Sequence, residues 1–486
     1  MKIYNTETLI IGAGPAGLAC AIKLLEEKKE FIVIEKDSLP GGLSKTYKFE
    51  EKDGSVFFAD NGPHRFFSKN PYLYEFLEEI LGDDWIKVKR YSRQYIDGKF
   101  YDYPINAIQA LKNIGPIKAF LMLSDYSISK IKFGLFKMPI NNFRDYIEAN
   151  FGKRLGEFNM INYTEKIWGI PADTIHQDWA GQRIKGLDLK QILIVSIKKL
   201  FNRKNNNTAS LIDEFYYPAN GTNQIYQNIV DKLIINKYDI FFETQLTSVT
   251  KTNDGFETEL MINNEKCLIK SKFLVESVPI TQFIKMLKPT PPQDVLDSIP
   301  DFKYRSQVYL FITLDKETLT RDQWIYLPKK EIPFARISEM RNFSNKLSPK
   351  GKTSLFLEFF CTENDNIWNM SKEELLNISL PHLEKMGLFS KNDIRQTYLI
   401  KQKYVYPIYD IHYKEYMQKT ISFIDSIENL FAIGRPGRFR YNNQDHSLEM
   451  GMLAAKCIID NKRYDFNVIG SEKDYYEKGD IVTKIK

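Results

Sequence analysis

The chain has 486 residues, of which 43% are hydrophobic and 14% aromatic, and its formal net charge is +6. This length allows two or three domains with a large buried core. So small a basic excess argues against a nucleic-acid partner, whereas it suits an anionic small-molecule substrate or a membrane surface. Four scattered cysteines without a CxxC pair argue against a zinc site or a disulfide framework, so no metal is expected.

The amino-terminal stretch has the order of a dinucleotide-binding βαβ unit. A strand-forming run leads into Gly12, Gly14 and Gly17, a helical run follows, and a second short strand ends on Glu35. The glycines permit a tight turn, a close approach of the backbone to a pyrophosphate, and close packing of the helix on the strand. The helix start offers N–H groups to the phosphates, and Glu35 can accept hydrogen bonds from a ribose diol. The unit therefore predicts an adenine dinucleotide ligand.

The residues after Glu35 favour FAD over NAD as this ligand. Gly41 and Gly42 follow the acidic residue closely, at a place where flavoproteins bring their backbone near FAD and which NAD dehydrogenases seldom share. The predicted cofactor contacts of this region are Gly12, Gly14, Ala16, Gly17, Glu35, Lys36, Gly42, Leu43 and Ser44.

A β-rich run next breaks at Gly62-Pro63 and places His64 on a turn. A lone histidine is usually structural or exposed, but this one lies between a turn and an aromatic pair. A structural role and a position facing the flavin therefore both stay open. We add Gly62, Pro63 and His64 to the predicted cofactor contacts.

The rest of the chain alternates between helical and strand-rich stretches. Residues 70–209 are predicted to be mostly helical, apart from a hairpin that turns at Asp97-Gly98. Short strands and turns then predict an antiparallel meander that returns to the cofactor domain, and residues 295–400 form a second excursion. A late strand running into Gly434, followed by a helix near Asp445, closes the nucleotide site.

These patterns predict an α/β fold in which a Rossmann-like GxGxxG FAD-binding domain is interleaved with helical and antiparallel β substrate domains. The FAD-binding domain comprises residues 1–69, 210–292 and 403–486, the last part including a C-terminal tail. The substrate domains comprise residues 70–209, mostly helical, and 293–402, of α+β type.

One basic segment is compatible either with a cytoplasmic protein or with one that contacts a membrane. Residues 187–204 are apolar at helical spacing on one side and rich in lysine and arginine elsewhere. We favour a core-packed helix with a solvated basic end, and the alternative is a peripheral membrane contact or a lipid-linked substrate. No apolar run approaches the roughly 18 residues that cross a bilayer, and the first strand leaves no room for a signal peptide. We therefore expect a cytoplasmic protein, with contact at the inner face of the membrane as the alternative.

Five later stretches carry a resemblance to a known family: residues 62–66, 163–168, 336–343, 434–441 and 443–447. With the glycine-rich unit, they make the chain similar to the FAD superfamily of amine oxidases, protoporphyrinogen oxidases and UDP-galactopyranose mutases. The first four stretches resemble the mutases more closely, and the fifth is similar to the eukaryotic mutases in particular.

This resemblance implies roles for individual residues. His64, Arg336 and Arg435 are the expected catalytic residues, with His64 orienting the flavin. An arginine guanidinium group can bind phosphate through two parallel hydrogen bonds. Each of these arginines could instead form an ordinary surface ion pair, which contributes little. The expected substrate contacts are Tyr163, Trp168, Arg183, Arg336, Arg435, Arg440 and Tyr441, and the further cofactor contacts are Leu246, Gly434, Gln444, Asp445, His446 and Ser447.

The resemblance also implies a function, with two alternatives. The expected enzyme interconverts the pyranose and furanose forms of a nucleotide-linked sugar through reduced flavin, in polysaccharide or cell-envelope biosynthesis, with NAD(P)H or another compound as reductant. One alternative is an FAD-dependent oxidoreductase that acts on an amine, a porphyrinogen or a lipid-linked sugar. The other is a non-catalytic FAD-binding partner in an envelope or polysaccharide assembly.

Overall fold

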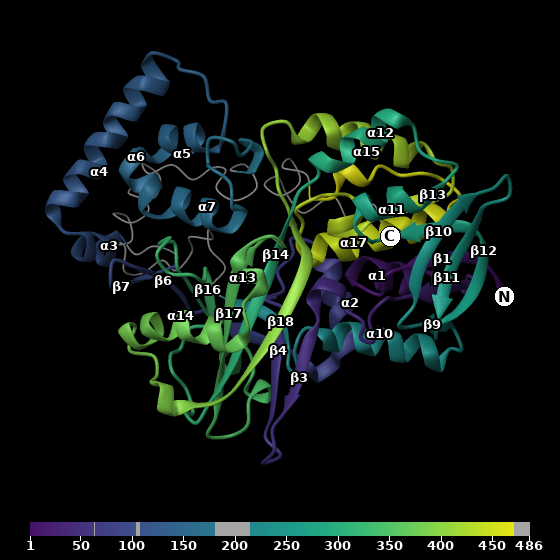
Figure 1. Ribbon diagram of the computed structural model, residues 1–486, viewed down its shortest axis with the longest axis horizontal. Helices are drawn as coiled ribbons and strands as arrows, with labels where there is room; N and C mark the ends of the chain where they lie inside the picture. The colour runs from purple at the N-terminus through teal and green to yellow at the C-terminus, as the bar shows by residue number, and fades with distance from the viewer. Residues whose placement is uncertain (63, 104–106, 180–213, 471–486) are drawn as a thin grey trace.

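The computed structural model describes residues 1–62, 64–103, 107–179 and 214–470 (Figure 1). Pro63, Arg183, the basic segment 187–204 and the tail 471–486 lie outside the described residues. Among the described helices, none is long and apolar enough to cross a membrane.

A mainly parallel sheet forms the cofactor side of the molecule. Its central strand β1 (Lys2–Ile11) pairs in parallel with β2 (Phe31–Ile34) on one side and β12 (Glu265–Glu276) on the other. At the outer positions, β9 (Asp239–Phe241) pairs with β2, and β19 (Leu430–Ala432) pairs with the end of β12. The inner strands are buried on both faces, which explains their continuous apolar runs.

The predicted meander extends this sheet beyond β12. Strands β10 (Gln245–Lys251) and β11 (Phe256–Ile262) pair antiparallel with each other, β11 pairs antiparallel with β12, and the short β13 (Leu287–Lys288) joins β10 in parallel. Segments from the beginning, middle and end of the chain thus meet in one sheet, as the interleaved organisation predicts.

Helices from distant segments cover one face of this sheet. Helix α1 (Pro15–Glu26) packs against α17 (Gln444–Ile459) and α10 (Asn223–Ile235), and α10 in turn packs against α2 (Pro71–Leu81). Helix α2 follows the predicted boundary at residue 70 and buries its apolar face in the same core as α1 and α10. The cofactor-side core therefore continues through residue 81.

A seven-stranded, mostly antiparallel sheet forms the second layer. The predicted hairpin at Asp97-Gly98 joins two of its strands, and both turn residues have positive φ values of 51° and 76°. This hairpin adds to the sheet through a parallel pairing of β6 with β15. In spatial order the strands are β18 (Ile394–Pro407), β14 (Tyr304–Leu314), β17 (Thr353–Cys361), β16 (Arg336–Glu339), β15 (Trp324–Tyr326), β6 (Ser92–Ile96) and β7 (Lys99–Asp102).

Two small sheets connect the layers. One pairs β3 (Thr46–Glu50) with β4 (Val56–Asp60), and the other pairs β5 (Trp85–Lys89) with β8 (Glu214–Pro218). The buried Asp60 carboxylate accepts hydrogen bonds from the Tyr217 hydroxyl at 2.6 Å and the Thr222 hydroxyl at 2.5 Å, which fixes the end of β4 to β8 and to the start of α10.

The remaining helices form a helical subdomain or cover the sheets. The subdomain has its own core, which includes Phe143, Ile147, Phe151 and Trp168. Its elements are α3 (Ala107–Ile114), α4 (Pro116–Ser129), a π-helical turn η3 (Lys130–Leu135), α5 (Phe143–Phe151), α6 (Lys153–Leu155), a π-helical turn η4 (Gly156–Ile161) and α7 (Asn162–Trp168). Elsewhere lie α11 (Ile280–Met286), α12 (Gln293–Ser298), α13 (Asn366–Asn369), α14 (Lys372–Lys385), α15 (Tyr413–Ser426) and α16 (Gly434–Gly437).

Candidate functional site

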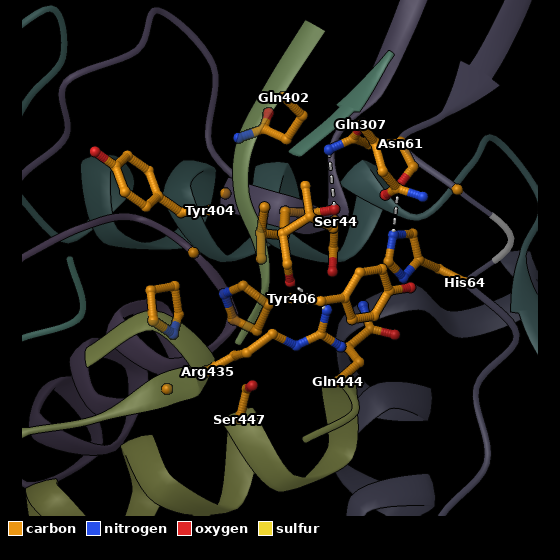
Figure 2. A pocket seen from close by; sticks show the side chains of 18 of the residues that line it. Ser44, Asn61, His64, Gln307, Gln402, Tyr404, Tyr406, Arg435, Gln444 and Ser447 are labelled. Carbon is orange, nitrogen blue, oxygen red and sulfur yellow. Dashed lines mark hydrogen bonds between the residues drawn. The ribbon is translucent and has the colours of Figure 1, made fainter. Parts of the chain in front are cut away.

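A cavity of about 1840 Å³ lies where the two layers and the helical subdomain meet. Its lining joins the glycine loop after β1, the end of β2, the turn around His64, helix α7, strands β16 and β18, and the start of α17. Figure 2 shows His64, Tyr406, Arg435, Gln444 and Ser447 grouped around this space. Because sites of about 300–1,000 Å³ hold drug-sized ligands, the cavity has room for a dinucleotide and a second molecule.

The glycine loop forms one wall of the cavity. Gly12 has a φ of +104°, and a Cβ on Gly17 would lie 1.9 Å from the Gly12 carbonyl oxygen. Gly17 therefore serves the packing of α1 on β1 and does not line the cavity, whereas Gly12 and Gly14 do. The backbone at Gly42 packs closely against this loop, because a Cβ on Gly42 would lie 3.2 Å from the Gly14 Cα. The start of α1 has no side-chain cap, so its N–H groups are available to an anion.

Glu35 is held at the end of β2. Its carboxylate accepts hydrogen bonds from the backbone N–H groups of Ala13 at 2.7 Å and Asp37 at 2.9 Å. Burial raises the pKa of Glu35, while these two backbone bonds act in the opposite direction. Each carboxylate oxygen keeps a further lone pair, so Glu35 can accept hydrogen bonds from a ribose. The other predicted contacts that line this part of the cavity are Ala16, Lys36, Gly42, Leu43, Ser44 and Leu246.

His64 is the residue predicted to contact the flavin part of the cofactor, and it also lines the cavity. Its Nε2 is 3.0 Å from the Asn61 carbonyl oxygen, and because a carbonyl only accepts, Nε2 carries the proton of the neutral ring. Burial lowers the pKa of His64, which favours the neutral form. The imidazole is thereby oriented with Nδ1 as an acceptor. Gly62 lines the cavity beside it, and Pro63 lies outside the described residues.

Helix α16 and the start of α17 supply the last predicted cofactor contacts. Gly434, Gln444, Asp445, His446 and Ser447 all line the cavity. Burial raises the pKa of Asp445 to about 7 and lowers the pKa of His446 to about 4. His446 also forms a capping box with Asn443 at the helix start, which fixes its ring. The His446 ring is therefore neutral near pH 7, whereas the Asp445 carboxyl is divided between its protonated and ionised forms.

Several buried polar atoms of lining residues have no hydrogen-bond partner within the described part of the chain. They are Asn61 Oδ1, Arg65 Nη1, Gln444 Oε1, Asp445 Oδ1 and the Nε1 atoms of Trp168 and Trp324. Unsatisfied buried polar groups are costly, so such a cluster indicates a ligand that supplies donors and acceptors. The phosphates, ribityl hydroxyls and ring edges of FAD provide both kinds of group. Together with the glycine wall and Glu35, these atoms fit FAD.

Arg336 and Arg435 line the cavity beyond His64, and Arg65 and Arg90 line it as well. Arg336 on β16 makes a bidentate ion pair with Glu358 on β17, with its Nε and one Nη each 2.5 Å from a carboxylate oxygen. Arg435 donates through Nε to the Asn442 carbonyl and through Nη1 to the Val405 carbonyl, both at 3.0 Å. Glu358 is fully buried, so the geometry of Arg336 is fixed from behind. The carbonyls of Asn442 and Val405 thus fix the orientation of the Arg435 guanidinium.

Aromatic side chains surround these arginines. The Arg435 guanidinium lies 5.0 Å from the Tyr406 ring centre and 5.2 Å from the Tyr441 ring centre, and the two rings stack at 5.5 Å. Trp168 is buried and packs edge-on against Trp179 at 4.4 Å. Tyr163 also lines the cavity, and burial raises its pKa well above the ordinary value, so its hydroxyl stays a donor.

The structure places one predicted substrate residue elsewhere. Arg440 does not line the cavity, and its guanidinium donates to the carbonyls of Phe466 at 3.3 Å and Asn467 at 3.3 and 3.4 Å. Phe439 has a φ of +47°, so the chain turns between Arg435 and Arg440 and sends the two side chains to different surroundings. The diphosphate contact of Arg440 therefore stays a prediction, and in this structure the guanidinium makes structural contacts to backbone carbonyls. Arg183 lies outside the described residues.

Sequence reasoning missed several lining residues. Tyr406, Gln307, Arg65 and Trp324 all line the cavity without having been predicted. Glu358 was also missed, although an acid in the middle of the apolar run 353–361 signals a buried ion pair. Tyr406, Gln307 and Trp324 carry no comparable signal, because their positions depend on how distant strands meet, whereas Arg65 directly follows the predicted His64 in the sequence.

Within the part of the chain that the structure describes, no group of three acidic, histidine or cysteine side chains is placed to hold a metal ion.

The cavity has the features of a flavoenzyme cofactor site. These features are the glycine loop, the buried Glu35 carboxylate and the buried polar atoms without hydrogen-bond partners. The chain belongs to the flavin containing amine oxidoreductase family, which it matches over residues 15–420, and its cofactor is FAD.

Individual relatives are distant. The chain is 22% identical over 327 residues to the L-amino-acid oxidase BjussuLAAO-I of Bothrops jararacussu, a match that spans 64% of this chain and only 60% of that oxidase. Its fold is similar to that of a reduced UDP-galactopyranose mutase, with a TM-score of 0.81, 22% identity and coverage of 97% of this chain and 98% of the other. It is also similar to putrescine oxidase bound to putrescine, with a TM-score of 0.60, 15% identity and coverage of 94% and 100%. The α/β fold and the predicted superfamily are confirmed.

Proposed function

We propose that this enzyme interconverts the pyranose and furanose forms of a nucleotide-linked sugar on reduced FAD, within polysaccharide or cell-envelope biosynthesis. The observation that carries the proposal is that Arg336 and Arg435 line one cavity together with Tyr163, Tyr406 and Tyr441. Two guanidinium groups beside phenol donors suit a diphosphate, because arginine binds phosphate through charge-assisted hydrogen bonds.

The same charges weigh against a cationic amine as substrate. A protonated amine would approach two guanidinium groups in a partly desolvated cavity, where repulsion is less screened than in water. His64 and His446, with their lowered pKa values, are neutral near pH 7 and do not change this charge balance. An anionic ligand therefore fits this end of the cavity better than an alkylammonium ion.

Each residue has a positioning role in this proposal. Arg336 uses its Nε and Nη2 on Glu358, which leaves Nη1 donors for a phosphate oxygen. Arg435 supplies positive charge opposite the leaving diphosphate, and the tyrosine hydroxyls donate to phosphate or sugar oxygens. FAD, held by the glycine loop, Glu35 and the residues around His64 and Gln444, would supply an electron-rich centre when reduced, with no net change of its redox state over a turnover. Positioning and electrostatic stabilisation are the contributions of the protein.

A second candidate is an FAD-dependent oxidoreductase, which family membership favours. A porphyrinogen or a lipid-linked sugar phosphate would be an anionic substrate of that class and would also suit Arg336 and Arg435. The two functions differ in what happens to the flavin. An oxidoreductase reduces oxidised FAD in each turnover, whereas an isomerase returns the flavin unchanged.

The test is to reduce the purified FAD-loaded protein with dithionite, add UDP-galactopyranose without oxygen, and follow furanose formation by chromatography. Isomerisation that requires reduction supports the proposal. Bleaching of oxidised FAD by a porphyrinogen, an amine or a lipid-linked sugar under anaerobic conditions, without isomerisation, contradicts it. NAD(P)H is proposed as a physiological reductant, and stopped-flow mixing with oxidised enzyme measures that step.

The cytoplasm is the proposed location, because a nucleotide-linked sugar is the proposed substrate. Fractionation of cells that produce the protein tests this.

A further inference from the structure

Helix α4 and the π-helical turn η3 carry a stripe of exposed apolar side chains far from the cofactor site. Ile117 is 77% exposed, Phe120 70%, Ile128 62% and Leu135 73%. With Leu121 and Ile131, these residues recur at intervals of three, four or seven positions, which places them along one side of a helix. In Figure 1, α4 lies at the outer edge of the molecule, on the side away from α1 and α17. We call these six residues the α4 stripe.

The stripe belongs to a well-packed helix. Met122 and Ser129 on the other side of α4 are buried, and α4 packs against α3, α5 and α6. Ser124 falls between Leu121 and Ile128, and its hydroxyl donates to the Phe120 carbonyl at 2.9 Å, so it adds no free donor to the stripe. Its surroundings therefore present the stripe outward as a rigid apolar ridge.

Basic side chains border the stripe. Between residues 107 and 138 the sequence has five lysines, Lys112, Lys118, Lys130, Lys132 and Lys137, and one acid, Asp125. The Asp125 carboxylate is held by Arg154 at 2.5 Å, on the side of α4 that faces α6. Lys118 forms an ion pair of 3.3 Å with Asp97, so the positive character beside the apolar ridge rests on the other four lysines.

This combination matches the surface of an anionic bilayer. A helix with large apolar side chains on one side and lysines beside them lies in the membrane interface, and its affinity increases with anionic lipid. A second copy of the chain would bring two sets of these lysines close together, where like charges repel. Charge complementarity therefore favours lipid over self-association.

We propose that the α4 stripe and its lysines are a peripheral membrane-docking surface for anionic lipid, independent of the reaction at the flavin. Docking would leave the catalytic cavity on a different part of the molecule. The surface also differs from the basic segment 187–204, which lies outside the described residues.

The test uses the FAD-loaded full chain and sedimentation with vesicles of phosphatidylcholine and phosphatidylglycerol, compared with pure phosphatidylcholine. The wild type is expected to bind the anionic vesicles, and more weakly at high salt. The variant Ile117→Ser/Phe120→Ser should bind at least about tenfold more weakly, because two large apolar side chains no longer enter the interface. Lys130→Gln/Lys132→Gln should lose about fivefold per lysine.

The matched control is Ile234→Ser/Ile235→Ser at the end of α10, where the two side chains are 56% and 78% exposed. It should bind vesicles like the wild type, and all variants should keep the flavin spectrum. The proposal is overturned if the wild type ignores anionic vesicles or if stripe and control variants bind equally. Sedimentation equilibrium distinguishes the alternative occupant, a second copy of the chain. If the wild type does not bind vesicles but forms a dimer that only the stripe variant loses, the surface is a dimer interface and the proposal is wrong.

Discussion

The substitution Arg336→Lys tests the proposed diphosphate site most sharply among single residues. Glu358 is fully buried and takes two hydrogen bonds of 2.5 Å from Arg336, so any cation at position 336 must first satisfy this carboxylate. Arginine does so with Nε and Nη2 and keeps Nη1 for a ligand. Lysine has one nitrogen, which the buried carboxylate would hold.

The variant should therefore lose one charge-assisted hydrogen bond to the substrate while keeping the charge. Such a bond contributes about 1.5–3 kcal/mol, so the Kd for UDP should increase about 10- to 150-fold. The assay is titration of the reduced, FAD-loaded protein with UDP, followed by flavin fluorescence or calorimetry. FAD content should stay at the wild-type level.

Arg440→Lys is the matched control, because Arg440 donates only to backbone carbonyls outside the cavity among the contacts seen. It should bind UDP like the wild type. If Arg336→Lys binds UDP within twofold of the wild type, or if both variants lose affinity equally, the assignment of Arg336 to the diphosphate is wrong.

Further substitutions test the cofactor side. Gly17→Ala should lower FAD content and thermal stability, because a Cβ would lie 1.9 Å from the Gly12 carbonyl oxygen; normal FAD retention would refute the close packing. Glu35→Gln should weaken FAD binding about tenfold, since a charged acceptor of ribose hydroxyls is lost, and equilibrium dialysis measures this. Burial lowers the pKa of His446 from 6.5 to about 4, so the unfolded chain binds more protons between these values and stability falls as the pH drops through that window. Urea unfolding with saturating FAD should show this loss, at most about 1.4 kcal/mol per pH unit, diminished in His446→Gln; equal pH slopes would contradict it.

Local patterns predicted the parts of the site that depend on short-range geometry. The glycine loop, the strand ending at Glu35 and the helix start near Asp445 can be predicted because tight turns and helix starts require particular residues at fixed spacing. The hairpin at Asp97-Gly98 follows from the same kind of requirement, and both residues have positive φ values. The sheet to which this hairpin belongs could not be predicted from local sequence, because the pairing of β6 with β15 joins segments more than 200 residues apart.

Features set by strand register could not be predicted. Arg336 and Glu358 are direct cross-strand partners of β16 and β17, and no local pattern aligns those two strands. The surroundings of Arg440 could not be predicted for a related reason. The spacing between Arg435 and Arg440 suggested a shared ligand, but the left-handed conformation of Phe439 separates the two side chains. The packing of α2 on α10, about 150 residues later in the chain, likewise has no local signal.

The central claim is that reduced FAD and a cationic, tyrosine-lined cavity together isomerise a nucleotide-linked sugar. Its most direct test is the dithionite-dependent conversion of UDP-galactopyranose by the purified protein, with the flavin spectrum recorded throughout. We predict that furanose appears only with reduced enzyme and that the flavin stays reduced without net consumption of reductant. The claim would be contradicted by two results together. A fully FAD-loaded, reduced enzyme that binds UDP would give no furanose, and a substrate would reduce the oxidised flavin.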